Sequence, residues 1–328
     1  MKLVNFVVDG EERVGAWVDP KIYDLNLGYA LALAEEVGAK KAREIAAVEL
    51  PPSMMDFIRL GRGALGRARR ALRFMAALSK GGSGKKGLSG AYDFKRVRLA
   101  APVPRPSKLF CLAGNYSEHI REGGGRVAEK EKTTPRVFMK PPTTTITAPN
   151  RPVVIPKKGN RIDWEVELAV VMGRRGKYIP KEKAYDYVFG YTILNDISER
   201  KLMIDIDREP RPGDEWFDWL NGKWMDTFAP MGPCLVLKDE IKGPHNLRIT
   251  LRLNGRTMQD ANTGDMIFSI PELIEWISRL VTLEAGDVIS TGTPSGVGSS
   301  SGTFLKKGDV LESQIEGIGM LRTPVTAE

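Results

Sequence analysis

The chain has 328 residues, 42% of them hydrophobic, and a formal net charge of +8, which suits a globular protein of one or two domains. Its two cysteines, Cys111 and Cys234, have no C-x-x-C partner, which argues against a disulfide framework and against thiolate zinc sites. No apolar run reaches the length of a membrane span, and the first residues resemble a strand more than a signal peptide, so we expect a cytoplasmic protein.

Residues 1–90 are predicted to form a small N-terminal α+β domain. Segments 3–8 and 13–18 flank Asp9-Gly10-Glu11, a pattern that predicts a β-hairpin. Helices are expected over 31–48 and 54–78, the second capped by Ser53. A linker rich in glycine, serine and lysine over 81–87 marks the boundary with a second domain, 91–328.

Positive charge is concentrated between Asp56 and Asp93, where nine lysines and arginines occur without an acidic residue. A basic interval of this kind is typical of nucleic-acid-binding proteins. However, Phe74 is the only aromatic residue between Arg59 and Lys86, and the helix there has an apolar stripe that favours burial. Nucleic-acid binding through residues 59–86 is therefore a remote alternative.

The second domain, 91–328, is predicted to be β-rich α+β. One helix is expected over 270–280, with Pro271 in its first turn. The absence of a βαβ rhythm and of a glycine-rich phosphate motif argues against a Rossmann fold. Strands are expected at 108–112, 143–146, 164–172, 187–194, 232–237, 247–253, 288–290 and 310–315.

Two glutamates, Glu165 and Glu167, interrupt the apolar strand expected over 164–172. Residues i and i+2 of a strand share a face, so both carboxylates point the same way. A divalent cation such as Mg²⁺ would neutralise them, although a strand with one wet face would also accommodate them. Asp196, which ends another expected strand, adds a third carboxylate, and three such ligands leave positions open for water or substrate.

His119 lies three residues before Glu122, so on a helical turn the two side chains would be neighbours. A carboxylate beside an imidazole fixes its tautomer and raises its basicity, which makes the pair a candidate base. The glycines 123–125 that follow favour a mobile lid. An ordinary surface histidine would show the same spacing, and the other histidine, His245, is expected at the surface.

Several motifs, in order and spacing, resemble those of the fumarylacetoacetate hydrolase superfamily, in its bacterial-type branch with three acidic metal ligands. The resemblance covers residues 108 to about 325 and implies a mixed β-sheet roll or sandwich with short flanking helices. The matching segments are Gly114-Asn115-Tyr116 with His119 and Glu122, Asp163 to Leu168, Gly190-Tyr191-Thr192 with Asn195-Asp196 and Arg200, Gly222-Lys223, Asn254-Gly255 with Gln259, Asp265 to Phe268, and Gly286 to Gly298.

The resemblance also implies roles for individual residues and a homodimeric assembly. It implies Mg²⁺ or Mn²⁺, with Ca²⁺ able to substitute, bound by Glu165, Glu167 and Asp196. The implied catalytic residues are His119, Glu122 and Lys223, and the implied substrate-binding residues are Arg200, Gly292, Thr293 and Tyr116. Lys140, which precedes Pro141-Pro142, is a further candidate for substrate contact. From the residues alone, Lys223 could lie at the surface, although Trp224, Phe228 and Pro230 around it favour partial burial, and 291–294 could be a plain turn.

The activity implied by the resemblance is metal-dependent hydrolysis of a C–C bond in an acylpyruvate or a related 1,3-dicarbonyl or 2-oxo acid, as in aromatic catabolism. The same site would suit oxaloacetate decarboxylation, hydroxymuconate isomerisation or dehydration of a 2-keto-3-deoxy sugar acid. A metal-binding scaffold without activity is a further alternative, but the presence of the full set His119, Glu122, Lys223 and Thr293 argues against it. The long segment 203–221, with Trp216 and Trp219, is expected to shape the pocket.

Overall fold

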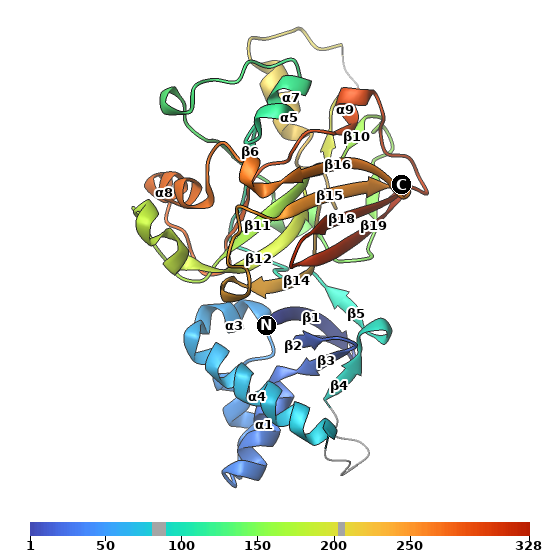
Figure 1. Cartoon of the computed structure of the whole chain (residues 1–328). Helices are drawn as coiled ribbons and strands as arrows, with labels where there is room; N and C mark the ends of the chain where they lie inside the picture. Colours follow the sequence, from blue (N-terminus) through green and yellow to red (C-terminus); the bar gives the residue numbers. More distant parts are fainter. Residues whose placement is uncertain (81–89, 203–206) are drawn as a thin grey trace.

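A computed structural model describes residues 1–80, 90–202 and 207–328 of the chain. The linker predicted over 81–87 lies outside the described residues. The first part of the chain forms a β-hairpin, a third strand, four helices and two short strands (Figure 1). In order these are β1 (Lys2–Val8), β2 (Glu11–Val18), β3 (Lys21–Asp24), α1 (Leu25–Glu36), α2 (Ala42–Glu49), α3 (Met54–Leu60), α4 (Arg62–Lys80), β4 (Ala91–Asp93), η1 (Phe94–Arg96) and β5 (Arg98–Ala100).

The predicted hairpin is confirmed, whereas both predicted long helices are divided. The helix expected over 31–48 is α1 and α2, with a break over 37–41. The helix expected over 54–78 begins as predicted, with the Ser53 side chain accepting a hydrogen bond from the Asp56 amide. It then breaks at Gly61, whose φ of 57° is disfavoured for residues with a side chain.

The basic helix α4 buries one face and pairs much of its charge. Ala64, Ala68, Ala71 and Met75 form its buried stripe, and the helix packs on α1. Its arginines form ion pairs with acidic residues of other segments, which weakens the nucleic-acid alternative. The pairs are Arg67 with Glu49, Arg69 with Asp239 and Arg70 with Glu36.

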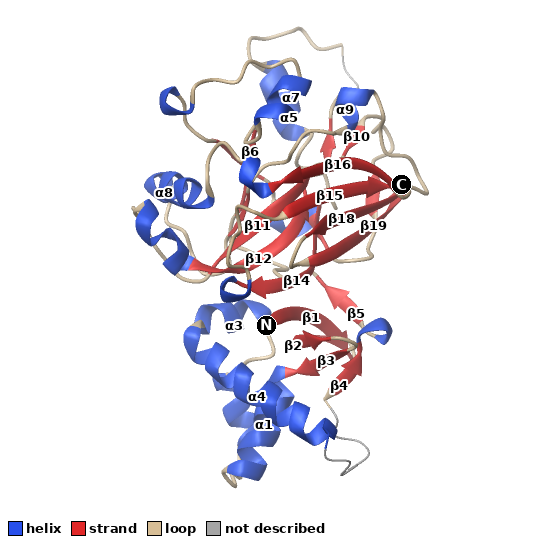
Figure 2. Ribbon diagram, viewed as in Figure 1, coloured by secondary structure: helices blue, strands red, loops and turns tan. Residues whose placement is uncertain are grey.

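The rest of the chain is β-rich, as predicted (Figure 2). Most expected strands and the helix at 270–280 occur within two or three residues of their predicted bounds. The elements are β6 (Leu109–Ala113), α5 (Ser117–Glu122), η2 (Lys130–Lys132), β7 (Arg136–Met139), α6 (Pro142–Thr145), β8 (Ile146–Thr147), β9 (Val153–Ile155), β10 (Ile162–Asp163), β11 (Val166–Met172), η3 (Lys181–Tyr187), β12 (Val188–Asn195), β13 (Ser198–Glu199), α7 (Asp214–Asn221), β14 (Ala229–Leu237), η4 (Lys238–Glu240), β15 (Arg248–Leu253), β16 (Arg256–Asn262), η5 (Thr263–Asp265), α8 (Ile270–Leu280), β17 (Val288–Ser290), α9 (Gly298–Ser301), β18 (Val310–Ile315) and β19 (Gly319–Ala327).

The strand predicted at 143–146 is wrong. Most of this segment belongs to the one-turn helix α6, and only Ile146 continues into a strand. Pro142 starts the turn, and the Thr145 hydroxyl donates to the Pro141 carbonyl oxygen, 2.7 Å away. The fixed backbone angle of proline therefore outweighs the β-propensity of the threonines that follow it.

Two packed sheets dominate the architecture. The larger sheet follows the order β4-β3-β2-β1-β14-β12-β11-β17-β6-β7, and the second follows β16-β15-β18-β19-β9 (Figure 1). Buried residues such as Leu168 of β11, Ile193 of β12, Leu251 of β15 and Leu311 of β18 belong to one apolar core between them. This arrangement confirms the expected β-rich α+β class with a sandwich of mixed sheets.

Strand β11 lies near the middle of the larger sheet and is buried along its entire length. Its residues alternate, because Leu168 and Val170 enter the sandwich core while Ala169 and Val171 enter a second core with the N-terminal helices. Glu167 falls on the same alternation as Ala169. The candidate metal ligand is therefore placed deep inside the protein by one of its most buried strands.

The N-terminal strands are continuous with the larger sheet, because β1 pairs with β14 on one side and β2 on the other. The division into domains 1–90 and 91–328 stays a prediction. Across residues 1–80, 90–202 and 207–328, none of the helices combines the length and the apolar character needed to cross a membrane.

We predict opposite stability effects for two glycine substitutions. In Gly190→Ala the new Cβ would lie 2.2 Å from the Val236 carbonyl oxygen of β14, so the free energy of unfolding should fall by about 3 kcal/mol. In Gly66→Ala the new Cβ meets no atom within 4 Å on the exposed side of α4, and stability should rise by about 1 kcal/mol. Urea denaturation of both variants measures the difference; equal effects would contradict the described strand contact.

Candidate active site

Three acidic side chains converge where β11 begins and β12 ends. One carboxylate oxygen from each of Glu165, Glu167 and Asp196 lies within 4.8 Å of the other two, and all three residues are buried. Strands β11 and β12 are antiparallel, with Val166 opposite Asn195. The pairing places the residues just outside each strand beside one another, and the Asp196 amide donates to the Glu165 carbonyl oxygen at 2.8 Å.

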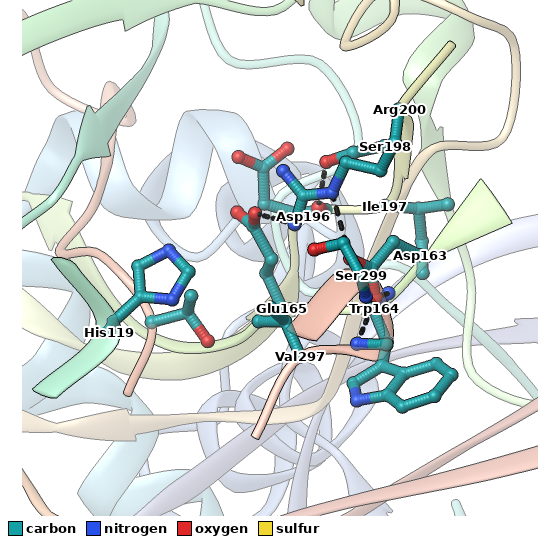
Figure 3. A network of polar contacts seen from close by, with 12 residues as sticks. His119, Asp163, Trp164, Glu165, Asp196, Ile197, Ser198, Arg200, Val297 and Ser299 are labelled. Carbon is teal, nitrogen blue, oxygen red and sulfur yellow. Dashed lines mark hydrogen bonds and ion pairs between the residues drawn. The ribbon is translucent and has the colours of Figure 1, made fainter. Parts of the chain in front are cut away.

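Glu165 is held by two cations. Arg200 Nη2 lies 2.5 Å from its Oε1 and Lys223 Nζ lies 2.8 Å from its Oε2. Burial opposes ionisation of this carboxyl, but Lys223 and Arg200 outweigh it and lower the pKa of Glu165 to about 2. Figure 3 shows Glu165 between the imidazole of His119 and the guanidinium of Arg200.

Glu167 lacks such compensation. Its Oε2 accepts a hydrogen bond from the Gly292 amide at 2.8 Å, whereas its buried Oε1 has no hydrogen-bond partner among the described residues. Burial and the charges of Asp196 and Glu165 raise the pKa of Glu167 well above its usual value. One buried carboxylate oxygen is therefore available to a ligand and would be stabilised by positive charge.

These features fit a divalent cation. A set of three carboxylates offers hard oxygen ligands, which Mg²⁺, Mn²⁺ and Ca²⁺ prefer. One oxygen of Glu167 lies within 4.8 Å of an oxygen of each of the other two acids, and its Oε1 has no hydrogen-bond partner among the described residues, so this side chain has an oxygen free to bind a cation. In this site Glu165, Glu167 and Asp196 would hold the cation.

Lys140 lies behind Asp196. Its side chain is fully buried, and Nζ donates to Asp196 Oδ1 at 2.5 Å and to the carbonyl oxygens of Ile197 and Phe228 at 2.8 Å each. All three ammonium protons are thus used, and Lys140 does not line the adjacent cavity. This geometry does not favour the predicted contact of Lys140 with substrate. Lys140 instead holds the carboxylate of Asp196 in place.

A cavity of about 630 Å³ opens beside the carboxylates. Glu165, Lys223, Arg200, His119 and Thr293 line it, together with aromatic residues of β7 and α7. Its volume is within the range of small-molecule sites. Five residues predicted from the sequence for the metal, for catalysis and for substrate binding therefore share one cavity.

Lys223 is buried and bridges two of the acids, since Nζ lies 2.8 Å from both Glu165 Oε2 and Asp196 Oδ2. The surface location that the sequence left open for it is therefore wrong. Burial opposes its charged form, but Asp196 and Glu165 outweigh this and raise the pKa of Lys223. The ammonium also lies over the rings of Phe138 and Trp219, at 5.4 Å and 5.5 Å from their centroids.

His119 and Glu122 form the predicted pair on α5. His119 Nδ1 lies 2.7 Å from Glu122 Oε1, and the other oxygen of Glu122 accepts the Gly296 amide at 2.8 Å. Burial opposes ionisation of Glu122, but its hydrogen bonds with His119 and Gly296 outweigh this and lower its pKa. The carboxylate thus fixes the imidazole while the ring lines the cavity.

The remaining predicted substrate residues have different surroundings. The Thr293 hydroxyl donates to the Val166 carbonyl oxygen at 2.9 Å and accepts from Gln259. The Gly292 amide donates a hydrogen bond to Glu167, and Gly292 does not line the cavity. Tyr116 does not line it either, and its buried hydroxyl has no partner in the part of the chain that the structure describes.

Two supporting residues had no assigned role in the sequence analysis. Asp163 is fully buried, bonds Arg200 Nε at 2.8 Å, and accepts the Gly298 and Ser299 amides at 2.5 Å and 3.0 Å. Gln259 accepts the Val166 amide and donates to Thr293 and Pro294. Asp163 lies two residues before Glu165, as Glu165 lies two residues before Glu167, and this repeated spacing indicates from the sequence that Asp163 belongs to the same group of acids.

His245 is half-buried, so its predicted surface location is only partly correct. Its Nε2 accepts the Ile270 amide at the start of α8, 3.2 Å away. Desolvation lowers the pKa of His245, which keeps the ring neutral and able to accept. Beside it, Glu272 of α8 forms an ion pair with Lys130 at 2.8 Å, joining the segment after α5 to this helix.

Comparison with known proteins identifies the family. Residues 108–326 match the model of the fumarylacetoacetate (FAA) hydrolase C-terminal domain. The chain therefore belongs to the fumarylacetoacetate hydrolase family of enzymes, as the sequence motifs indicated.

Individual relatives show several activities within this family. The chain is 39% identical to human mitochondrial oxaloacetate tautomerase FAHD2A over 274 residues, 83% of this chain and 79% of that protein. It is 47% identical to an uncharacterised protein of Pyrococcus abyssi over 224 residues, 68% of this chain and 92% of the other. It is also similar to the structure of maleylpyruvate hydrolase from Sphingobium sp. SYK-6 in complex with manganese(II) and pyruvate, with a TM-score of 0.70 and 27% identity over 100% of this chain and 99% of that one.

We predict that Glu167→Gln raises the melting temperature in EDTA, because it removes a buried charge that Asp196 and Glu165 repel. Mg²⁺ or Mn²⁺ at a hundred times its Kd should stabilise the unsubstituted protein by about 2.7 kcal/mol, and the variant should lose most of this gain. Thermal unfolding with EDTA and with added cation measures both effects.

Glu165→Gln is the matched control for this experiment. It should lower the melting temperature in EDTA, because it weakens the contacts with Arg200 and Lys223. An identical cation-dependent shift in the Glu167→Gln variant and the unsubstituted protein would refute the assignment of Glu167 as a ligand.

Proposed function

We propose that the protein is a divalent-cation-dependent enzyme of 2-oxo acids, in which a proton is transferred at the carbon beside the oxo group. The observation that carries this proposal is the convergence of three acids, one buried lysine and one histidine–carboxylate pair on a single cavity. The acids can bind a cation, the lysine can stabilise negative charge that develops on an oxygen, and the histidine–carboxylate pair can transfer a proton.

The charge balance of the site supports an anionic substrate. Among the described residues, the connected cluster holds four carboxylates, from Asp163, Glu165, Glu167 and Asp196, and three cations, from Lys140, Arg200 and Lys223. With all groups charged, one negative charge remains. A divalent cation would reverse its sign, and the substrate carboxylate beside the oxo group would then restore neutrality within this cluster, which a buried site favours.

Each side chain has a task in this scheme. A bound Mg²⁺ or Mn²⁺ would supply Lewis acidity towards the oxygens of the 2-oxo acid. Lys223 is placed to stabilise negative charge that develops on the oxo oxygen, while Arg200 contributes a second positive charge to the cavity. His119, oriented by Glu122, takes the proton from the neighbouring carbon or returns it.

Keto–enol interconversion of oxaloacetate or a related 2-oxo diacid is the preferred reaction. It needs only a proton carrier and stabilisation of the oxygen, both of which the cavity offers. Its support is the 39% identity with the human oxaloacetate tautomerase, which extends over 83% of this chain and so includes much of its N-terminal part.

Hydrolysis of a C–C bond in an acylpyruvate, the activity expected from the sequence, is the second candidate. Its support is the similarity to maleylpyruvate hydrolase. For this reaction the His119–Glu122 pair would activate a water molecule, a step that the same geometry allows.

We also keep the homodimer, the preference for Mg²⁺ or Mn²⁺ and the cytoplasmic location as proposals.

A panel of substrates, assayed with EDTA and after addition of Mg²⁺ or Mn²⁺, tests the activity. The panel contains oxaloacetate, for tautomerisation and decarboxylation, and an acylpyruvate, a hydroxymuconate and a 2-keto-3-deoxy sugar acid. We expect oxaloacetate tautomerisation to be the fastest reaction, to stop in EDTA and to return with the cation. Undiminished turnover in EDTA would refute the cation dependence, and faster release of pyruvate from the acylpyruvate would favour the hydrolase.

Glu122→Gln tests the proton-transfer pair. The amide cannot stabilise a charged imidazole as the carboxylate does, so kcat should fall by about 10²–10⁴-fold while KM changes little. The control is Glu118→Gln on the same helix, because Glu118 is exposed and bonds only Arg121 among the described residues. Comparable kcat values for the two variants would remove the pair from the mechanism.

A further inference from the structure

Lys223 uses the same carboxylate oxygens that a divalent cation needs. Its ammonium bonds Glu165 Oε2 and Asp196 Oδ2 at 2.8 Å each. The second oxygens of these acids bond Arg200 and Lys140. All four oxygens of the two carboxylates are therefore engaged by cationic side chains, and a metal ion needs at least one oxygen from each.

The three cations differ in how firmly they are held. Lys140 is anchored by the carbonyl oxygens of Ile197 and Phe228 and does not line the cavity. Arg200 is anchored by a second carboxylate, that of Asp163. Lys223 lines the cavity, and its ammonium bonds no backbone oxygen in the described parts of the chain. Of the three cations, it would therefore break the fewest other hydrogen bonds if it moved away from the two acids.

The space beside Lys223 can receive its ammonium. Phe138 and Trp219 pack edge to face, with centroids 5.0 Å apart, and both rings line the cavity. The ammonium already lies within 6 Å of both centroids, the range in which a ring face attracts a cation. The four-carbon stem of lysine allows a shift towards these rings without movement of the backbone.

We propose that Lys223 and the divalent cation compete for Glu165 and Asp196, so that binding of the cation transfers the Lys223 ammonium to the Phe138–Trp219 wall of the cavity. Two positive charges beside the same oxygens repel each other, and the ion, with its higher charge, takes the carboxylates. Lys223 then faces the substrate, so the cation must bind before the lysine can act. This inference rests on the proposed cation dependence.

Lys223→Met tests the competition directly. Isothermal titration with Mg²⁺ should show a Kd lower than that of the unsubstituted protein by about tenfold or more, because the competing charge is gone. Lys201→Met is the control: it removes the same charge from an exposed neighbour of Arg200 and should leave Kd within about twofold. An equal or weaker affinity of Lys223→Met for Mg²⁺ would overturn the inference.

Tryptophan fluorescence provides a second measurement that retains Lys223. Mg²⁺ should change the emission of the unsubstituted protein, since the ammonium moves against the face of Trp219. The change should be lost in Trp219→Phe and in Lys223→Met, and kept in Trp216→Phe, whose tryptophan lines the cavity but has no described contact with Lys223. An undiminished change in Trp219→Phe would overturn the inference.

The two proposals fail in different ways. If neither the unsubstituted protein nor Lys223→Met binds Mg²⁺ or Mn²⁺, both the cation dependence and the competition are refuted. If both bind the ion with equal affinity, the cation dependence stands and only the competition is refuted.

Discussion

The structure depends on neutralising a group of carboxylates that the fold buries completely. Glu167 and Asp196 have no exposed surface, and ionised acids are costly to remove from water unless cations accompany them. Buried basic side chains from three different segments supply most of this compensation, through Lys140, Arg200 and Lys223. Glu167 is the acid of this group without a cationic partner among the described residues, and under the proposed function a bound cation would complete the compensation there.

The surrounding architecture holds these charges in register. Strand β11 is covered on both faces, and its pairing with β12 places Glu165 and Glu167 beside the end of β12. Asn195 of β12 accepts the Glu165 amide, and Gln259 of β16 accepts the Val166 amide, so the second sheet also supports the site. Polar contacts from both sheets of the sandwich therefore fix the backbone that carries the acidic side chains.

Local patterns predicted the parts of the site that depend on spacing alone. The separation of Glu165 and Glu167 was sufficient to place both on one side of β11, and the separation of His119 and Glu122 was sufficient to pair them on α5. The orientation of Lys140 and the role of Asp163 depend on contacts between segments far apart in the sequence. The spacing of neighbouring residues gives no information about such contacts. The break at Gly61 was missed because the apolar stripe continues across it.

The loop after β17 has a consequence for how substrate range can diverge. Its amides at Gly292, Gly296 and Gly298 bind the carboxylates of Glu167, Glu122 and Asp163 respectively. At Gly296 even a methyl group would lie 2.0 Å from the Met258 carbonyl oxygen, so this loop tolerates little variation. Selection for a new substrate would then act more readily on cavity residues outside this loop, such as Trp216 of α7, which takes part in none of these three bonds.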